Sequence, residues 1–295
     1  MAVNDRNKNL VTAMADMAIF STHSFPTYWD SAVAAAKPKW LVVDANWAEQ
    51  DLQHWIKAGR KHSAKVAFEP VSAAKSERLF PPIKGNKVVG VFPKRPIVDL
   101  ATPNQYELAA MYAAALRNEY FESATNGWFE IIDAFGIRGG ARDKFVRLCG
   151  MEATDAGIPV QSVNLLPYIP TIVTKMGSKG ALLTQILRPE DERLNDPEEM
   201  DFILTRATNG HPHVGGVYMR FFETVEDVPL NDIVSVNAVG DTFLGVLIAG
   251  LAQGGRVDKL VDVAQRAAVM TLRSHGGVSA ELGEMMAGLR EAVDN

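Results

Sequence analysis

The chain has 295 residues, of which 47% are hydrophobic and 22% charged, an ordinary balance for a globular protein able to bury a large α/β core. The net charge of −5 gives no basic surface, which argues against nucleic-acid binding. The single cysteine, Cys149, excludes an internal disulfide framework and fits a reducing compartment. Its neighbours are typical of a helix, so we expect a buried thiol and not a catalytic one.

No apolar run approaches the ~18–20 residues of a membrane span, because glycines interrupt the longest run, residues 243–252. Residues 1–10 lack the apolar core of a signal peptide. We therefore expect no membrane association and a cytoplasmic location.

The first residues are expected to form a short hairpin, with strands at residues 1–3 and 10–17 joined by a polar turn. Beyond it, strands and helices alternate, which is typical of a mainly parallel sheet with helices on both faces. The expected organisation is one domain over residues 1–295, with the hairpin at residues 1–20 and an α/β core at residues 38–295.

The first strand of the core is expected at residues 40–45, an apolar run rich in β-forming residues. Asn46 is followed three residues later by Glu49, as in a capping box, and this predicts a helix that stops at Gly59.

Two further strands are expected at residues 65–69 and 96–100. Ser72 is the predicted N-cap of the helix between them. A helix at residues 105–117 should follow the second strand, and helical sequence continues to about Ala156.

The second half begins with a strand, a glycine turn and a strand, at residues 172–174, 176–180 and 181–183. The polar stretch at residues 188–214 indicates a surface excursion. Three helices then close the chain, at residues 241–253, 257–274 and 280–293.

The stretch VNAVGDTFLG places small residues directly before Asp241 and an apolar helix. In a doubly wound sheet, ligands bind where strands end and helices begin. The N–H groups of Ala238, Val239 and Gly240 would there face an anion, and Asp241 would be placed to take a proton from an attacking hydroxyl. The alternative is that Asp241 only caps the helix.

Three other motifs also have two interpretations. Gly177 and Gly180 allow a nucleotide to lie against bare backbone, or they form an ordinary hairpin turn. Asn104 and Glu107, at a strand-to-helix junction, could place a carboxylate near hydrated Mg²⁺, or form a helix cap with an acidic first turn.

The third motif is the pair His211 and His213, which suggests a metal site. No matching cysteine or carboxylate pattern lies nearby, so a solvated loop is the preferred interpretation.

The order of these motifs resembles the ribokinase-like, or phosphofructokinase-B, family of sugar kinases, and within it the pseudouridine kinases. N-x-x-E is followed by strand–GxxG–strand, then by (G/A)-x-G-D at a helix start and an Ala-rich helix. The supporting stretches are AVNDRNKNLVTAMADM, LVVDANW, FEPVSAAKS, TPNQYEL and AQRAAVMTLRSHGGVS. The resemblance extends from about Met1 to Glu281 and implies a three-layer ribokinase-like fold with a central, mainly parallel sheet and a lid hairpin at the start.

The resemblance also implies roles for individual residues. Asp241 would be the base that activates the hydroxyl, with Ala238, Val239 and Gly240 as the anion hole, and Glu107 would help to organise Mg²⁺ through water. The residues implied to flank ATP are Thr174, Gly177, Gly180, Gln265, Ser274 and Gly277. Those implied at the phosphate end of the cleft are Glu69, Lys75 and Asn104.

The chain departs from the family pattern in two places. Family members usually have glycine where Ala238 stands. The added Cβ is either harmless or crowds the phosphate, the second if that residue needs a positive φ. The family also normally begins with a segment that grips the sugar and that is absent here, so the chain resembles an N-terminally truncated member.

Three functions are therefore carried forward. The first is ATP-dependent phosphorylation of pseudouridine to pseudouridine 5′-phosphate. The second is a truncated relative that binds nucleotide as a regulatory module, and the third is a kinase for another sugar or nucleoside. A homodimer formed through lid strands is a further implication of the resemblance.

Overall fold

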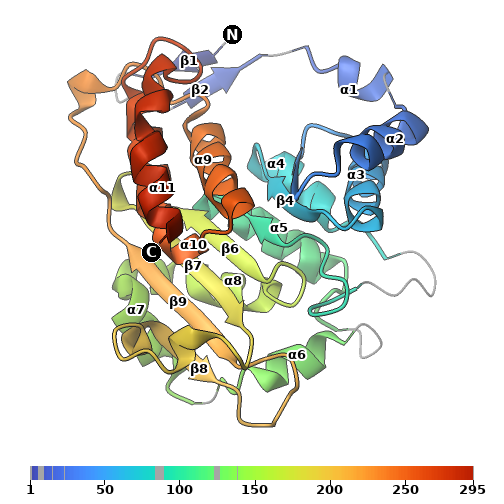
Figure 1. The fold of residues 1–295 in the computed structure, drawn as a ribbon, viewed down its shortest axis with the longest axis vertical. Coiled ribbons are helices and arrows are strands. Elements are labelled where there is room, and N and C mark those ends of the chain that lie inside the picture. The colour runs from blue at the N-terminus through green and yellow to red at the C-terminus, as the bar shows by residue number, and fades with distance from the viewer. Residues whose placement is uncertain are drawn as a thin grey trace. The chain divides into compact units, whose positions relative to one another are not determined.

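The computed structural model describes residues 2–5, 10–14, 16–22, 24–83, 90–122, 127–137 and 139–294 (Figure 1). The chain divides into two compact units. Unit 1 comprises Met1–Ser24, Met176–Ala181 and Phe222–Asn295, and unit 2 comprises Phe25–Lys175 and Leu182–Phe221. The single-domain boundaries expected from the sequence stay a prediction, and each unit is described by itself.

Unit 2 is built on a seven-stranded sheet with the order β3-β4-β5-β6-β7-β9-β8. The strands from β3 to β6 are parallel to their neighbours, whereas β8 and β9 are antiparallel. The mainly parallel sheet is thus confirmed for the half that begins at β3. The strands are β3 (Trp40–Asp44), β4 (Lys65–Glu69), β5 (Leu100–Ala101), β6 (Thr171–Lys175), β7 (Ala181–Leu187), β8 (Ile203–Arg206) and β9 (Gly216–Phe222).

The helices that connect β3 to β6 pack against the strands and against one another. Among them α3 packs on both β3 and β4, α4 on α5, and α5 on α8. The helices of unit 2 are α2 (Pro26–Ala36), α3 (Glu49–Lys61), α4 (Ala73–Ser76), α5 (Gln105–Arg117), α6 (Trp128–Ala134), α7 (Ala141–Asp155) and α8 (Ile158–Leu165), with short 3₁₀ turns η1 (Glu77–Leu79), η3 (Glu192–Leu194) and η4 (Met200–Phe202).

The predicted ends of α3 are wrong at both sides. The helix begins after Ala48 without a side-chain cap, so Asn46 is not its N-cap, and it continues through Gly59 to Lys61. A Cβ on Gly59 would lie 2.9 Å from Val66 Cγ2 and 3.0 Å from Leu41 Cδ2. The glycine therefore allows the helix to approach the sheet closely instead of ending it.

Around β4 the predictions are confirmed more closely than at the strand that follows it. The strand at residues 65–69 and the Ser72 cap are as expected, with the Lys75 N–H donating to Ser72 Oγ at 3.4 Å. The strand expected at residues 96–100 is wrong, since β5 is only Leu100–Ala101. The N–H groups of Ile97 and Val98 both donate to the Tyr168 carbonyl, which breaks the ladder there.

The predicted surface excursion at residues 188–214 contains a strand that the sequence reasoning missed. Leu204 in β8 is buried, and β8 pairs with β9 at the edge of the sheet. The expected burial of Cys149 in a helix is confirmed, and burial raises the pKa of its thiol.

Unit 1 combines the N-terminal hairpin with three packed helices. The hairpin is confirmed as an antiparallel pair, and α9 packs against α10 and α11. A Cβ on Gly250 of α9 would lie 2.4 Å from Leu260 Cδ2, so the glycine allows α9 and α10 to lie close together. The elements are β1 (Ala2–Asn4), β2 (Leu10–Ala13), α1 (Ile19–Thr22), η2 (Gly177–Lys179), η5 (Leu230–Asp232), α9 (Val239–Gln253), α10 (Val257–Leu272), η6 (Ala280–Met285) and α11 (Met286–Asp294).

In the described part of the chain, none of the helices combines the length and apolarity that a membrane crossing requires.

Candidate functional site

The turn before α9 places Asp241 differently from the expected cap. The helix begins at Val239, two residues earlier than expected, with Ala238 as the N-cap residue, so Asp241 is the third helical residue. No side chain of the N-cap residue bonds the first turn, and Asp241 is exposed. The capping interpretation of Asp241 is therefore wrong, and the first N–H groups of α9 have no hydrogen-bond partner among the described residues.

Ala238 itself adopts φ 57° and ψ 10°, the left-handed region. An alanine held there costs about 1–2 kcal/mol relative to a glycine-like position, because Cβ crowds the following carbonyl. The concern that this residue needs a positive φ is confirmed. Such strain persists where the surrounding structure holds it in place.

Two sets of hydrogen bonds hold the turn against the end of α10. The Leu272 carbonyl accepts from the N–H groups of Val234 and Ser235, at 2.8 and 3.1 Å. One residue after Asp241, the buried Thr242 hydroxyl lies 2.9 Å from the Thr271 hydroxyl, which also accepts from the Ser279 N–H at 3.3 Å. Buried hydroxyls that are satisfied in this way fix the start of α9 relative to the loop after α10.

The glycine turn at residues 177–180 is a 3₁₀ turn whose two glycines have different roles. Gly180 has φ +112°, and a Cβ there would lie 2.0 Å from the Phe222 carbonyl oxygen, so no other residue fits. Gly177 has φ +62°, and nothing lies within 4 Å of a Cβ built on it. Gly180 is therefore needed for packing, while Gly177 presents bare backbone to open space.

The remaining residues predicted near ATP in unit 1 lie on and after α10. Gln265 is buried, and its Nε2 donates to the Glu223 carbonyl at 3.0 Å and to Asp262 Oδ1 at 3.2 Å. Ser274 Oγ accepts the Gly276 N–H at 3.1 Å, and Gly277 is exposed.

Arg273, just before this loop, pairs through both terminal nitrogens with the carboxylate of Glu226. Hydrogen bonds from Arg273 lower the pKa of the Glu226 carboxyl. The pair joins the end of α10 to the segment after β9.

In unit 2, a buried carboxylate lies at the carboxyl end of the parallel strands. Glu69, the last residue of β4, accepts from Thr102 Oγ1 at 2.9 Å and from Lys175 Nζ at 3.3 Å. Lys175 ends β6, and its N–H donates to the Pro103 carbonyl at 2.7 Å. The pair neutralises the charge of Glu69, since a buried carboxylate requires a partner.

Asn104 and Glu107 form the capping box at the start of α5. Asn104 Oδ1 accepts the N–H groups of Tyr106 and Glu107, and Glu107 Oε2 accepts the Asn104 N–H at 2.7 Å. The cap interpretation is thus confirmed. A role of Glu107 at Mg²⁺ stays a prediction, as does a role of Asn104 at phosphate.

Lys75 and Arg78 both bind the segment at residues 45–47, in which Asn46 was predicted as a helix cap. Its Nζ donates to Asn46 Oδ1 at 2.6 Å, and Arg78 Nη1 donates to the carbonyls of Ala45, Asn46 and Trp47 at 2.8–3.0 Å. The sequence did not lead us to predict Arg78 or Lys175 as residues near the candidate site. The signal for Lys175 was its position, a cation at the carboxyl end of a parallel strand.

Thr174 is fully buried, and its hydroxyl has no hydrogen-bond partner among the described residues. Its burial gives no support to a direct nucleotide contact, which stays a prediction. Within the described ranges there is also no cluster of three or more His, Cys, Asp or Glu side chains arranged to hold a metal ion.

The predicted residues thus form two groups. The first is in unit 1 and consists of Ala238, Val239, Gly240, Asp241, Gly177, Gly180, Gln265, Ser274 and Gly277. The second is in unit 2 and consists of Glu69, Lys75, Asn104, Glu107 and Thr174. Lys175 and Met176 join the two units covalently directly before the glycine turn.

Comparison with known proteins identifies relatives of the chain. Residues 217–282 match the model of the pfkB family carbohydrate kinases. A pseudouridine-metabolizing bifunctional protein of Schizosaccharomyces pombe is 29% identical over 289 residues, which cover 97% of this chain and 35% of that protein. The chain therefore spans about a third of the length of this curated relative.

The fold also matches a solved structure. A nucleoside kinase of Burkholderia thailandensis, in complex with inosine, aligns over 100% of this chain and 69% of that chain, with a TM-score of 0.50 and 12% identity. Over residues 217–282 the chain is therefore similar to the pfkB family of carbohydrate kinases, and it shares its fold with this nucleoside kinase.

Proposed function

We propose that the chain transfers the γ-phosphoryl group of ATP to a hydroxyl group of a nucleoside or sugar. The observation that carries this proposal is the turn before α9, where an exposed carboxylate follows an uncapped helix start inside the segment that matches the kinase family. Phosphoryl transfer needs a proton acceptor beside a group that stabilises anionic charge, and this turn supplies both.

Asp241 accepts the proton of the attacking hydroxyl while the oxygen of that hydroxyl forms a bond to the γ-phosphorus of ATP. The bond from that phosphorus to the β–γ bridging oxygen breaks, and its electron pair leaves with ADP. The N–H groups at Ala238, Val239 and Gly240 face the phosphoryl oxygens, assisted by the positive end of the α9 dipole.

We assign direct nucleotide contacts to Gly177, Ser274 and Gly277. Gly180 and Gln265 stabilise the glycine turn and α10 beside the nucleotide. The open space beside Gly177 is what a backbone cradle for a nucleotide requires, because any side chain there would fill it. Thr174 is also assigned to the nucleotide, as the family resemblance implies.

Mg²⁺ would enter with the nucleotide and neutralise charge on its phosphates. Glu107 is the carboxylate assigned to it, through water, and the capping box fixes the orientation of that carboxylate. Glu69, Lys75 and Asn104 are assigned to the phosphate end of the cleft.

Pseudouridine is the proposed acceptor, with pseudouridine 5′-phosphate as the product. The support is the name of the Schizosaccharomyces pombe relative, which aligns with nearly the whole chain. Other nucleosides and sugars are the alternative acceptors. A cytoplasmic location and a homodimer complete the proposal.

The test is an assay of the purified protein with ATP, Mg²⁺ and pseudouridine, with uridine and ribose as competing acceptors. ADP release that depends on pseudouridine is the expected result. ATP binding in a calorimeter without turnover of any acceptor would contradict the kinase proposal and select a nucleotide-binding module.

Gly177→Val tests the nucleotide half separately. The β-branched side chain would enter the open space beside the turn, so ATP affinity should fall by about tenfold or more, equivalent to a loss of at least one hydrogen bond to a charged group. Unchanged calorimetric affinity in a folded variant would show that the turn has only a structural role.

A further inference from the structure

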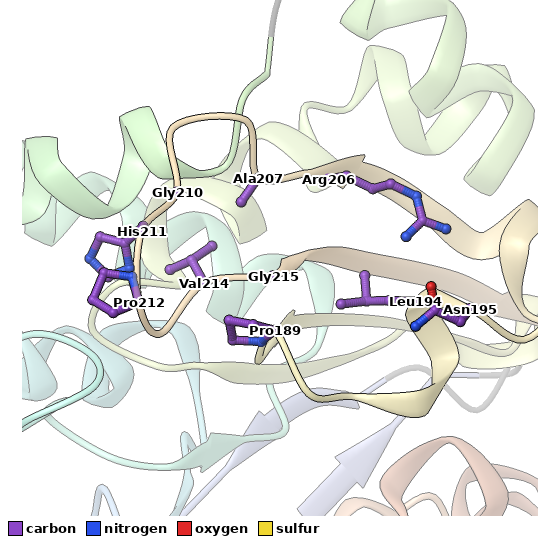
Figure 2. A pocket seen from close by; sticks show the side chains of 10 residues that line it. All are labelled: Pro189, Leu194, Asn195, Arg206, Ala207, Gly210, His211, Pro212, Val214 and Gly215. Atoms are coloured by element: carbon purple, nitrogen blue, oxygen red, sulfur yellow. The ribbon is translucent and has the colours of Figure 1, made fainter.

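Outside the candidate kinase site, unit 2 has a surface hollow of about 530 Å³ within the predicted excursion (Figure 2). This volume lies within the range of ~300–1,000 Å³ that is usual for small-molecule sites. Its apolar surface comes from Pro189, Leu194, Ala207, Val214 and Gly215, together with Gly210 and Pro212, and its polar groups from Asn195, Arg206 and His211.

Close backbone contacts form the walls of this hollow. A Cβ on Gly215 would lie 2.6 Å from both the Arg188 carbonyl oxygen and Leu194 Cδ1. Gly215 also donates its N–H to the Leu187 carbonyl at 2.8 Å and accepts the Ala207 N–H at 2.9 Å. The segment before β9 is thus held against the end of β7, which leaves the hollow between fixed chain segments.

A buried arginine anchors the wall that carries Leu194 and Asn195. Arg193 binds the Asp191 carboxylate through Nε and Nη2, at 2.9 and 2.8 Å, and Gln185 Oε1 through Nη1 at 2.9 Å. Its guanidinium also lies 4.9 Å from the centre of the Tyr218 ring. A wall held in place by such contacts loses little freedom when a ligand binds.

The polar groups lie at opposite ends of the hollow. Figure 2 shows Arg206 and Asn195 at one end and His211 at the other. The guanidinium of Arg206 is exposed and makes no hydrogen bond or ion pair with any residue that the structure describes.

At the other end, the solvated-loop interpretation is wrong for His211, whose side chain is only 7% exposed. Its Nδ1 accepts the His213 N–H at 3.2 Å, which places the ring proton on Nε2, 3.5 Å from Glu130 Oε1. The His211 ring is thus held in place by these contacts and forms part of the wall of the hollow.

We infer that this hollow binds a small organic anion, with a carboxylate or phosphate group at Arg206 and Asn195 and an apolar body over Leu194 and Val214. A guanidinium that has no partner among the described residues matches the planar, bidentate geometry of either anion. The apolar surface beside it favours a molecule with a ring or short chain over a free inorganic ion. None of the lining residues has a role in the proposed phosphoryl transfer, so the site is separate from that reaction.

Phenyl phosphate and benzoate are suitable probes, because each joins an anion to an apolar ring, with phenol and inorganic phosphate as component controls. Titration of isotope-labelled protein, followed by NMR, should move the signals of residues around the hollow. Arg206→Gln should weaken binding of both probes by about tenfold or more, the value of a hydrogen bond to a charged group. Arg290→Gln, which removes an exposed arginine of α11, should leave binding unchanged.

A second variant keeps the charge and fills the space. Ala207→Phe places a ring in the hollow and should abolish binding while Arg206 remains. Equal binding by the parent and Arg206→Gln, displacement of phenyl phosphate by ATP, or no binding of either probe would each overturn the inference. ATP affinity is measured on the same variants and should not change, which separates this outcome from the fate of the proposed kinase function.

Discussion

The helices α7 and α9 begin with the same local geometry but with different residues at the critical position. Each follows an N-cap residue in the left-handed region, Gly140 at φ 82° and Ala238 at φ 57°. Neither has a side-chain cap, and each has an exposed aspartate as its third residue, Asp143 or Asp241. A glycine adopts this conformation freely, whereas an alanine does so under strain.

An open helix start with an aspartate occurs at both helices, so it does not by itself distinguish a reactive site. At α9 the turn is additionally tied to α10 through Leu272 and through the pair Thr242 and Thr271. The strained alanine also lies in the segment that matches the kinase family. Backbone strain that the surrounding contacts maintain is frequent at functional sites, which is consistent with the proposed role of this turn.

The strongest test of this difference exchanges each aspartate for asparagine. Asp241→Asn should lower turnover by ~10²–10⁴-fold, because an amide cannot accept the hydroxyl proton, while ATP affinity is largely kept. Asp143→Asn has the same local position and should leave turnover unchanged. Steady-state turnover is measured for both variants. Full turnover by Asp241→Asn would show that Asp241 is not the base.

Thr271→Val tests the contacts that hold the α9 turn. Removal of this hydroxyl leaves the buried Thr242 hydroxyl and the Ser279 N–H without their partner, so the free energy of unfolding should fall by about 1–3 kcal/mol. Thr271→Ser keeps the hydroxyl and should recover most of this loss. Urea unfolding measures both variants, and a Thr271→Val variant as stable as the parent would contradict the role of this hydroxyl.

A reciprocal exchange at the two N-cap positions sharpens the comparison further. Gly140→Ala should destabilise the protein by about 1 kcal/mol, since the left-handed penalty of ~1–2 kcal/mol exceeds the entropy gained in the unfolded chain. Ala238→Gly should be neutral or stabilising by less than ~1 kcal/mol for the same reason. If urea unfolding showed Ala238→Gly to be strongly destabilising, the alanine methyl group would have a packing role instead.

The smallest effect concerns pH and the pair of Arg273 and Glu226. The pKa of Glu226 is lowered in the folded chain, so the pair stabilises the fold above the ordinary pKa of 4.5 and loses this contribution as the pH falls. Because both side chains are 40–45% exposed, the effect should be small and sensitive to salt. The difference in urea midpoint between the parent and Glu226→Gln should shrink on acidification, and a constant difference would contradict the assignment.

Elements that depend on neighbours in the chain were predicted well. The strand β4, the helix α5 with its Asn104 cap and the N-terminal hairpin follow from apolar runs, turn residues and side chains that bond their own backbone. The ends of α3 were predicted wrongly, because Gly59 serves contact with Val66 and Leu41, which no local signal reveals.

For the candidate site, the sequence by itself determined the order of the motifs and the residue types at each turn, because spacing along the chain sets which groups follow a strand or open a helix. Only the tertiary structure decided how they are held. Lys175 meets Glu69 across 106 residues, Thr242 meets Thr271 across 29, and Ala238 takes a positive φ. Each depends on packing between segments that are distant in the sequence, since a buried charge, a buried hydroxyl and a strained residue are stable only when other parts of the fold supply the partner.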